Sequence, residues 1–411
     1  MREIGTRESR KDAGVAGVRR VLMIVHSYYD EDPRVRREAE ALVAAGRPVT
    51  VIGLRREHDE REGVVAGVRV IRLDVQRHQG AGLGTYLREY FSFLVRAGWR
   101  AVTIHRRRHV ALVQVHSLPD FLVFAALPLR LVGVPVILDL HEAMPELFRS
   151  RFPRAANPAI QWLLRLQEHL SIRAATLTLS VNDAMRGRLI ALGEDPESIV
   201  MVRNLPSLRR FDPALHPRRR FAEDGVIRVV YSGALTPIYE LEVGIRALGR
   251  LARSRPDLRL TLDVYGRGDS QPQFEQLAVD EGIADDVRFH GRIPLEDMPA
   301  VLARSDIGLA PTRLDPFTEL SLSTKVYEYA AMGVVVIASR LPLVERTFPT
   351  GSVIPYEPGD DASLAAAIEH VVDDAAAREA SIARAAEAVR ESSWETESIA
   401  YVELVNRLAV D

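Results

Sequence analysis

Residues 21–54 read VLMIVHSYYDEDPRVRREAEALVAAGRPVTVIGL, and the order of elements within this stretch decides the fold. Its first five residues are all apolar, which is the pattern of a parallel strand buried on both faces. Asp32 and Pro33 then open a helix as its cap and first-turn proline, and Gly46 ends it. Val49–Leu54 is a further apolar run. The stretch therefore predicts a right-handed strand–helix–strand unit.

The same alternation continues through the first half of the chain and restarts in the second. In the first half we expect further strands at residues 112–115, 134–138, 175–180 and 199–202, with a helix over 121–131. In the second half we expect strands at residues 227–231, 259–265, 287–289, 306–310 and 334–338, with helices over 241–252 and 364–389. Two successive sets of alternating strands and helices predict an α/β protein with two doubly wound, Rossmann-like domains. Because ligands of such sheets bind beyond the carboxyl ends of the strands, we expect the site in a central cleft that the domains face.

A chain of 411 residues is too long for one ordinary hydrophobic core. Its periodicity is interrupted between residues 206 and 223 by prolines and a basic run, which places the domain junction there. The expected organisation is a flexible tail over residues 1–18 and an N-terminal Rossmann-like domain over 19–205. A C-terminal Rossmann-like domain follows over 206–385, and a C-terminal helix over 386–411 packs back on the N-terminal domain.

The composition is that of a globular protein, with 47% hydrophobic and 27% charged residues. The absence of cysteine excludes disulfides, thiolate metal sites and a cysteine nucleophile. The first 18 residues lack the apolar core of a signal peptide, and the longest apolar stretch, residues 118–138, is broken by charged residues and prolines. We therefore expect a cytoplasmic protein.

The net charge of −2 conceals an asymmetry between the two halves. Residues 1–205 carry 31 basic and 23 acidic side chains, and residues 206–411 carry 23 basic and 33 acidic ones. Different partners for the two domains explain this difference, and solubility is the alternative explanation.

Several familiar chemistries lack their motifs. The turn at residues 26–30 has no G-x-G-x-x-G, and the chain contains no Walker A sequence and no G-x-S-x-G elbow. Residues 141–145 begin like a zinc-protease motif, but Pro145 stands where the second ligand is required. No metal site and no nucleic-acid-binding module is therefore expected.

Glycine turns follow three expected strands of the second half. Gly233, Gly266 and Gly291 each stand at or near a strand end, where a glycine lets a ligand approach the backbone closely. A single glycine turn of this kind is an ordinary connection between a strand and a helix. An ordered series of such turns fits the phosphates of a nucleoside diphosphate.

Only two of the 54 basic residues are lysines, Lys11 and Lys325. Lys325 belongs to an expected short helix over residues 323–333, and Glu328 shares its face. An ammonium suits a diphosphate, and a carboxylate accepts hydrogen bonds from ribose hydroxyls. A surface ion pair between the two residues is the alternative.

The combined motifs resemble retaining glycosyltransferases of family 4, over roughly residues 19–400. The resemblance rests on residues 32–39 and 138–142 in the first half and on residues 287–291, 302–306 and 324–338 in the second. It implies the GT-B fold, an acceptor-binding N-terminal domain, a donor-binding C-terminal domain, and a hexosyltransferase that uses a nucleoside-diphosphate sugar without a metal or other cofactor. It also implies a role in glycan biosynthesis, with a glycan, lipid-linked or small-molecule acceptor.

The resemblance also assigns individual residues. Those implied to bind the donor are Gly233, Gly266, Arg292, Ile293, Thr324, Lys325 and Glu328. Those implied in catalysis are His141, Lys325 and Glu328, with His141 positioning the donor sugar or acceptor while the leaving phosphate takes the acceptor's proton. Residues expected at the cleft are His116, Glu142, Asn204 and Glu319. A structural role for His141, with Glu142 or Asp139 to orient it, and a turn role for Asn204 remain open.

The chain departs from the family pattern at three positions. Many members have two glutamates eight positions apart, and the first falls on Leu320 here, with Glu319 one residue away. Many also have an arginine and a lysine where this chain has Ala234 and Tyr239. Lys325 is then the cation left for the diphosphate. The departures motivate an alternative, a catalytically silent nucleotide-binding partner, and a further one is a sugar-nucleotide epimerase on the same fold.

Residues 86–99 combine aromatic side chains with arginines, and three further arginines follow at 106–108. A basic helix with aromatic residues is typical of a membrane-surface element, so we expect a peripheral contact with anionic membrane. Burial of the aromatic face in the domain core is the alternative.

Overall fold

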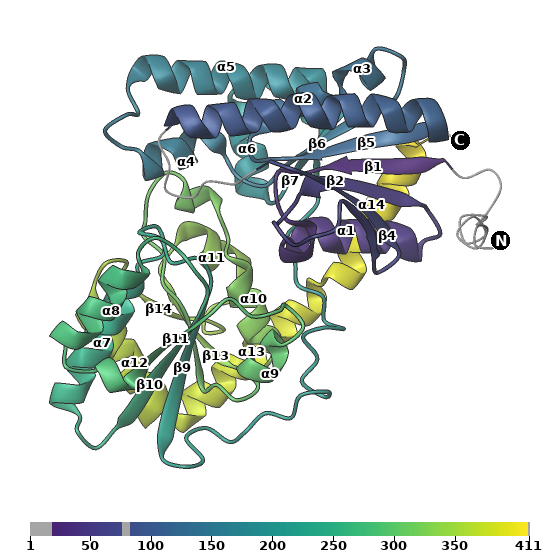
Figure 1. The fold of residues 1–411 in the computed structure, drawn as a ribbon. Coiled ribbons are helices and arrows are strands. Elements are labelled where there is room, and N and C mark those ends of the chain that lie inside the picture. The colour runs from purple at the N-terminus through teal and green to yellow at the C-terminus, as the bar shows by residue number, and fades with distance from the viewer. Residues whose placement is uncertain (1–18, 76–82, 410–411) are drawn as a thin grey trace, which may run out of the picture. The chain divides into compact units, whose positions relative to one another are not determined.

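The computed structural model describes residues 19–75 and 83–409 (Figure 1). It contains two predominantly parallel sheets, one of eight strands in the order β3-β4-β2-β1-β5-β6-β7-β8 and one of six in the order β11-β10-β9-β12-β13-β14. The strands are β1 (Arg20–Ile24), β2 (Val49–Leu54), β3 (Glu62–Val65), β4 (Val68–Leu73), β5 (Val110–His116), β6 (Val136–Leu140), β7 (Leu177–Ser180), β8 (Ile199–Met201), β9 (Val226–Ser232), β10 (Arg259–Tyr265), β11 (Val287–Gly291), β12 (Ile307–Ala310), β13 (Val335–Ser339) and β14 (Ile354–Tyr356).

Helices connect most of these strands. They are α1 (Pro33–Ala44), α2 (Leu83–Arg108), α3 (Leu127–Arg130), α4 (Met144–Arg151), α5 (Pro158–Ala174), α6 (Asp183–Ala191), α7 (Leu241–Ser254), α8 (Gln271–Asp280), α9 (Met298–Leu302), α10 (Thr324–Ala331), α11 (Pro342–Thr347), α12 (Asp361–Asp373), α13 (Ala375–Glu391) and α14 (Trp394–Leu408). The expected two-sheet α/β architecture is confirmed. At α1 the Asp32 side chain accepts from the Val35 backbone N–H at 3.2 Å, as a cap should.

Three expected elements differ in the structure. The predicted helix over residues 121–131 is mostly a 3-10 helix, η2 (Asp120–Ala126), followed by the single turn α3. The predicted helix over 364–389 is two helices, because Asp374 caps α13 by accepting from the Ala377 backbone N–H at 2.8 Å. An antiparallel pair, β3 with β4, extends the first sheet beyond the expected parallel strands.

Packing divides the described chain into two compact units. The first comprises the chain up to Asp139, Ser171–Thr178 and the chain from Tyr401 onward. The second comprises Leu140–Leu170 and Leu179–Ala400. The second unit therefore groups residues 140–170 and 179–205 with the six-stranded sheet.

The end of the chain returns to the first unit. The Tyr401 hydroxyl on α14 donates to the Gln114 side chain at 2.7 Å, and Arg47 donates to Asn406 at 2.8 Å. Both Tyr401 and Gln114 are fully buried. These hydrogen bonds tie the last helix to the strand β5 and to the loop that follows α1.

The central strands β12 and β13 of the six-stranded sheet are buried on both faces. Along β13, Val335 and Ile337 join a core with α7 and α12, whereas Val336 and Ala338 join a second core with α10 and α13. Alternate side chains of one strand thus enter different cores, which explains the uninterrupted apolar run in the sequence.

Among the described residues, no helix is long and apolar enough to cross a membrane.

Candidate functional site

The strand order of the six-stranded sheet reverses between β9 and β12. At such a switch point the connections leave in opposite directions, and a crevice opens beyond the carboxyl ends of the two strands. Ser232 and Gly233 stand at the end of β9, and Thr312 follows β12. The topology of the sheet therefore predicts a ligand site beyond the ends of β9 and β12.

Helix α10 is fixed above the switch point by Tyr329. Its ring packs over Gly308 of β12, where an added Cβ would lie 2.3 Å from the ring. The Tyr329 hydroxyl accepts from the Ser232 backbone N–H at 2.9 Å. A glycine in a buried strand and a tyrosine on the helix thus fit each other, and they set where Lys325 and Glu328 lie.

The glycine turns at the strand ends pack against one another. Gly233 and Gly266 have φ of 151° and 152°, values that favour glycine. A Cβ on Gly266 would lie 1.8 Å from the Gly233 carbonyl oxygen, and one on Gly268 would lie 2.1 Å from that of Leu235. No side chain fits at these positions, so the turns present bare backbone at the ends of β9 and β10.

The Lys325 ammonium is buried beside this backbone. The side chain is 4% exposed, and a Cβ on Gly233 would lie 2.8 Å from its Nζ. Two rings flank Nζ, with the Tyr231 centroid at 4.1 Å and the Tyr239 centroid at 4.4 Å. Within residues 19–75 and 83–409, Nζ has no hydrogen-bond partner. A buried ammonium with three unused donors is a strong signal for an anionic ligand.

Burial sets the protonation of this group. It lowers the pKa of Lys325 from the usual 10.5 to about 7, and the Glu328 carboxylate acts in the opposite direction. Glu328 is itself 9% exposed and lies one turn further along α10. The two residues are therefore not the surface ion pair that the sequence left open.

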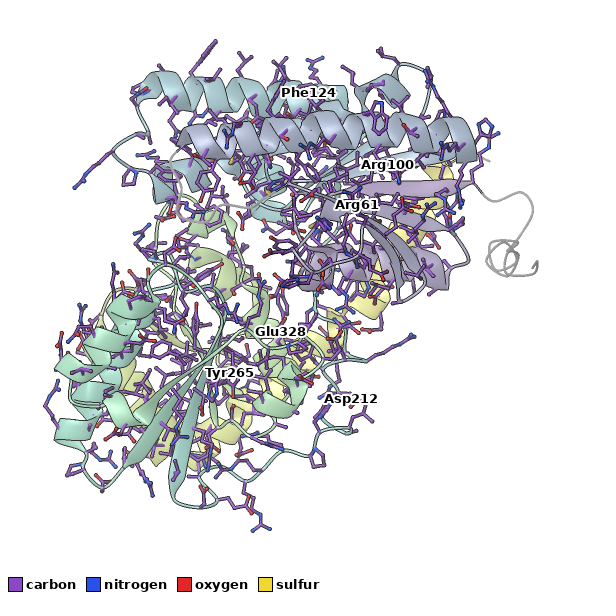
Figure 2. All side chains as sticks on the ribbon, viewed as in Figure 1. Arg61, Arg100, Phe124, Asp212, Tyr265 and Glu328 are labelled. Carbon is purple, nitrogen blue, oxygen red and sulfur yellow. The ribbon has the colours of Figure 1, made fainter. Side chains whose placement is uncertain are left out.

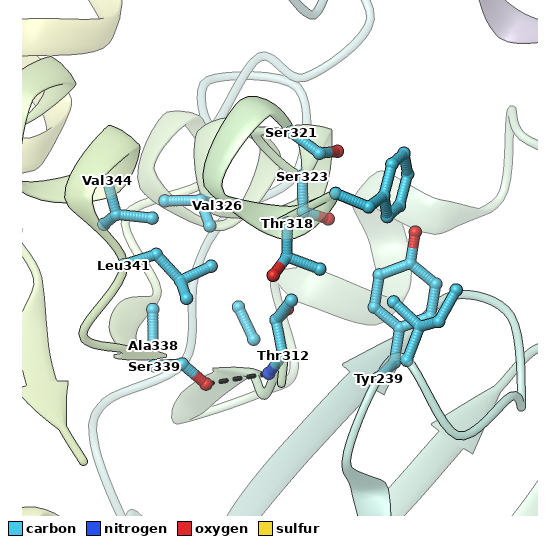
Figure 3. Close-up of a pocket in the computed structure, with 13 residues that line it drawn as sticks. Tyr239, Thr312, Thr318, Ser321, Ser323, Val326, Ala338, Ser339, Leu341 and Val344 are labelled. Carbon is cyan, nitrogen blue, oxygen red and sulfur yellow. Dashed lines mark hydrogen bonds between the residues drawn. The ribbon is translucent and has the colours of Figure 1, made fainter. Parts of the chain in front are cut away.

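A small pocket adjoins the start of α10 (Figure 3). Tyr239, Ser321 and Ser323 contribute to its walls, and the Thr312 backbone N–H donates to the Ser339 hydroxyl at 2.7 Å at its base. Thr324 is the first residue of α10 and is half-buried. The start of α10 therefore lies beside a pocket with both apolar and hydroxyl-bearing walls.

The segment of His141 and Glu142 follows β6 and is half-buried. Burial raises the pKa of the Glu142 carboxyl, and the neighbouring His141 opposes this. Burial also raises the pKa of the Tyr239 hydroxyl to about 12, with a further contribution from the Glu142 charge. Within the second unit, Glu142 is thus close enough to Tyr239 to act on it electrostatically.

In the first unit, His116 and Asp139 belong to a buried polar network. Arg34 donates to Asp139 at 2.6 and 2.9 Å, and His116 Nδ1 lies 3.0 Å from Asp139 Oδ2. Both His116 and Asp139 are 0% exposed. Asp139 is therefore engaged by Arg34 and His116 in a network that is closed to solvent.

The remaining predicted residues lie in several settings. Arg292 is exposed and Ile293 is half-buried in the turn after β11. Asn204 is half-buried in the loop after β8. Glu319 is exposed in the 3-10 helix η5 (Thr318–Leu320), and the Leu320 carbonyl accepts from the Asn182 side chain at 2.9 Å.

Sequence reasoning missed the aromatic residues around Lys325. Tyr231 is the last residue of the strand expected over residues 227–231, and no role was assigned to it. Tyr239 was noted only as a departure from the family pattern. The two rings flank the Lys325 ammonium through a contact between distant parts of the chain, which no local sequence pattern predicts.

Two sequence families match the chain. "Glycosyl transferases group 1" matches residues 227–374, and "Glycosyl transferase 4-like domain" matches residues 32–204. The matched ranges lie on either side of residues 205–226. The glycogen synthase of Mycobacterium tuberculosis is 26% identical over 382 residues, which cover 89% of this chain and 87% of that protein.

Solved structures share the fold. The sucrose-phosphate synthase of Thermosynechococcus elongatus aligns with a TM-score of 0.77 at 17% identity, covering 95% of this chain and 99% of that one. The Anabaena protein Alr3699/HepE, solved in complex with UDP and glucose, aligns with a TM-score of 0.69 at 16% identity, covering 95% and 100%.

Proposed function

Since the chain belongs to the glycosyltransferases with group 1 and family 4-like domains on the GT-B fold, we propose that it moves a hexosyl group with retention of configuration. A nucleoside-diphosphate sugar is the donor. The observation that carries the proposal is the buried, unpartnered ammonium of Lys325 beside the bare backbone of Gly233. A diphosphate supplies the acceptor oxygens that this ammonium lacks.

The other donor contacts that we propose follow the family resemblance. The N–H groups at the start of α10, from Thr324 onward, and the backbone at Gly266 take phosphate oxygens. Glu328 accepts from the ribose hydroxyls. Arg292 and Ile293 contact the base through their backbone. Glu319 approaches the sugar in the role that Leu320 cannot fill.

Lys325 also accounts for the two departures near the phosphate site. Tyr239 occupies the position of a family lysine, and its ring instead flanks the Lys325 ammonium. Ala234 has no charged side chain, and its carbonyl accepts from the Tyr231 hydroxyl at 2.6 Å. One ammonium held between two tyrosines thus replaces a pair of cations.

The reaction that we propose breaks the bond between the anomeric carbon and the leaving phosphate oxygen. The acceptor oxygen forms its bond to the same carbon on the same face, and its proton passes to the leaving phosphate. The products are the glycosylated acceptor and a nucleoside diphosphate. His141, oriented by Glu142 or Asp139, positions the sugar or the acceptor during this exchange.

The acceptor is proposed as a class of molecules. The similar proteins include a glycogen synthase and a sucrose-phosphate synthase, so similarity does not select one acceptor. We propose that residues 19–205 hold a glycan, a lipid-linked sugar or a small molecule. The excess of basic residues in this half favours an acceptor that carries phosphate.

A thermal-shift screen across UDP-, GDP-, ADP- and TDP-sugars tests the donor. One base should raise the unfolding temperature more than the others, because a bound donor stabilises the folded state by mass action. Transfer or slow hydrolysis of that donor should follow. Binding without turnover would support a silent partner, and conversion of the sugar without an acceptor would support an epimerase.

Donor affinity should fall as the pH rises from 7 to 9. The diphosphate binds the ammonium form of Lys325, whose pKa in the free protein is about 7, so binding takes up a proton. Above that pH the affinity should fall up to about tenfold per unit. The unliganded protein should show the opposite trend and gain stability as pH rises from about 7 to 10.5, because the unfolded chain then binds the extra proton.

Titration calorimetry at several pH values, each in two buffers of different ionisation enthalpy, measures the affinity and the proton uptake. The Lys325→Met variant is the control, because it has no ammonium to titrate and should bind the donor without proton uptake. Constant affinity and no proton uptake in the wild-type protein would contradict the assignment.

A further inference from the structure

Helix α2 of the first unit exposes a row of large apolar side chains. Leu87 is 53% exposed, Phe91 66%, Val95 51% and Trp99 70%. They recur every fourth residue, so they lie along one side of the helix. The opposite side is buried through Phe93 and other core residues. Burial of the whole aromatic face in the domain core was the alternative that the sequence left open. Phe91 and Trp99 are instead exposed on α2.

The charges on α2 are almost all positive. The helix contains six arginines, at residues 88, 96, 100 and 106–108, and one acidic residue, Glu89. Glu89 is 6% exposed, and its Oε1 lies 3.1 Å from Nε2 of His26. Along Leu83–Arg108 the exposed apolar row is thus accompanied by cations without any exposed carboxylate.

The apolar row ends at a groove lined by arginines. Arg61 before β3, Arg72 on β4, and Arg96 and Arg100 on α2 surround about 530 Å³ of space beside Trp99. Figure 2 shows Arg61 and Arg100, which approach the groove from different elements.

Two carboxylates compensate part of this charge. Glu62 pairs with Arg100, and Asp74 also lines the groove, so four cations face two anions. Within the described part of the chain, the Arg61 guanidinium makes no hydrogen bond or ion pair. The groove therefore has an excess of positive charge, and the N–H groups of the Arg61 guanidinium are available to bind an anion.

We propose that the outer side of α2 docks on an anionic phospholipid surface, with the apolar row in the interface and a lipid phosphate in the arginine groove. An apolar row flanked mainly by cations matches such a surface, where negative headgroups lie beside acyl chains. The exposed Trp99 at the groove fits the headgroup level, where one end of an indole is wet and the other is apolar. Docking is independent of donor chemistry.

The test uses the full chain and vesicles without any donor. The protein should co-sediment with vesicles of equal parts phosphatidylglycerol and phosphatidylcholine, and added salt should weaken this binding. It should not bind phosphatidylcholine alone. Because no nucleotide is present, failure here leaves the proposed transfer reaction untouched.

Two double variants separate the two parts of the surface. Phe91→Ser with Trp99→Ser should weaken binding at least about tenfold by removing the two largest apolar side chains. Arg96→Gln with Arg100→Gln should weaken it about 25-fold, since each basic residue near an anionic surface contributes about fivefold. Val279→Ser, at an exposed apolar position of α8, and Arg346→Gln, at an exposed position of α11, are the matched controls and should bind as the wild type does.

Unchanged binding in both double variants would overturn the proposal. A second result would also overturn it. If the wild-type chain does not bind vesicles but forms a dimer in light scattering, and Phe91→Ser dissociates that dimer, the apolar row is an interface between two copies. Circular dichroism and unfolding temperature confirm that each variant is folded. Donor-dependent stabilisation should be equal in all of them.

Discussion

Replacing Lys325 with methionine should lower kcat/KM for the donor by about 10³, the largest effect expected of any single substitution in this chain. The ammonium is the buried cation beside the Gly233 backbone, and it stabilises the negative charge that grows on the leaving diphosphate. Removing one such donor from a water-excluded site costs about 10²–10³ in rate, and weaker binding of the donor adds to this. Steady-state kinetics with the donor from the thermal-shift screen measures the loss.

Lys325→Met is also expected to keep or raise the stability of the unliganded protein. The methionine side chain fits between the Tyr231 and Tyr239 rings, and it removes a charge that burial disfavours. Lys325→Arg should be poorly active as well, because a planar guanidinium is bulkier than an ammonium and differently shaped. A folded methionine variant with full activity would contradict the site.

Replacing Glu328 with glutamine should lower kcat/KM about 100-fold, mostly through KM. A hydrogen bond that involves a charged group contributes about 1.5–3 kcal/mol, and the ribose is held alike in the ground state and the transition state. Glutamine preserves the shape of a side chain that is 9% exposed. Steady-state kinetics of this variant and of the wild type with the same donor separates the effect on kcat from the effect on KM.

A donor whose ribose lacks both hydroxyls provides the sharper comparison. The wild-type enzyme should lose about the same factor with this donor, and Glu328→Gln should then lose little more, because the partner is already gone. Glu345→Gln, at an exposed carboxylate that pairs with Arg340 at 2.9 Å, is the matched control and should be active. Independent, additive losses would show that Glu328 acts elsewhere than on the ribose.

Most of the second sheet was predictable because its strands are buried on both faces. Continuous apolar runs such as the one that forms β13 admit few other interpretations. The β3–β4 pair was not predictable in the same way. Val64 of β3 is 72% exposed, so no apolar face distinguishes this strand from a loop.

The split of the C-terminal helical region illustrates a second limit. Alanine-rich sequence on both sides of Asp374 favours one long helix. The aspartate side chain instead caps a new helix and the chain changes direction there. A single residue that competes for backbone N–H groups thus outweighs propensity summed over many residues.

The candidate site was predictable where it depends on local backbone. The glycines at 233 and 266 and the isolated lysine are visible in the sequence, and the structure places them together at the switch point of the sheet. The packing of Tyr329 over Gly308 was not visible. It joins a helix to a strand through a shape match that no sequence spacing encodes.

His116 shows the converse. Its place at the end of a strand suggested a cleft residue, yet its side chain is 0% exposed and bound to Asp139. Strand ends are where ligands bind, but they are also where neighbouring strands and helices bring buried charges together. Sequence position alone does not separate the two cases.

The central claim is that the buried ammonium of Lys325 binds the diphosphate of the donor. Titration calorimetry of the matching nucleoside diphosphate into the wild-type protein and the Lys325→Met variant at neutral pH tests it most directly. The account predicts that the wild type binds with proton uptake, and that the variant binds about 100-fold more weakly without it. Equal affinity in the two proteins would contradict the account.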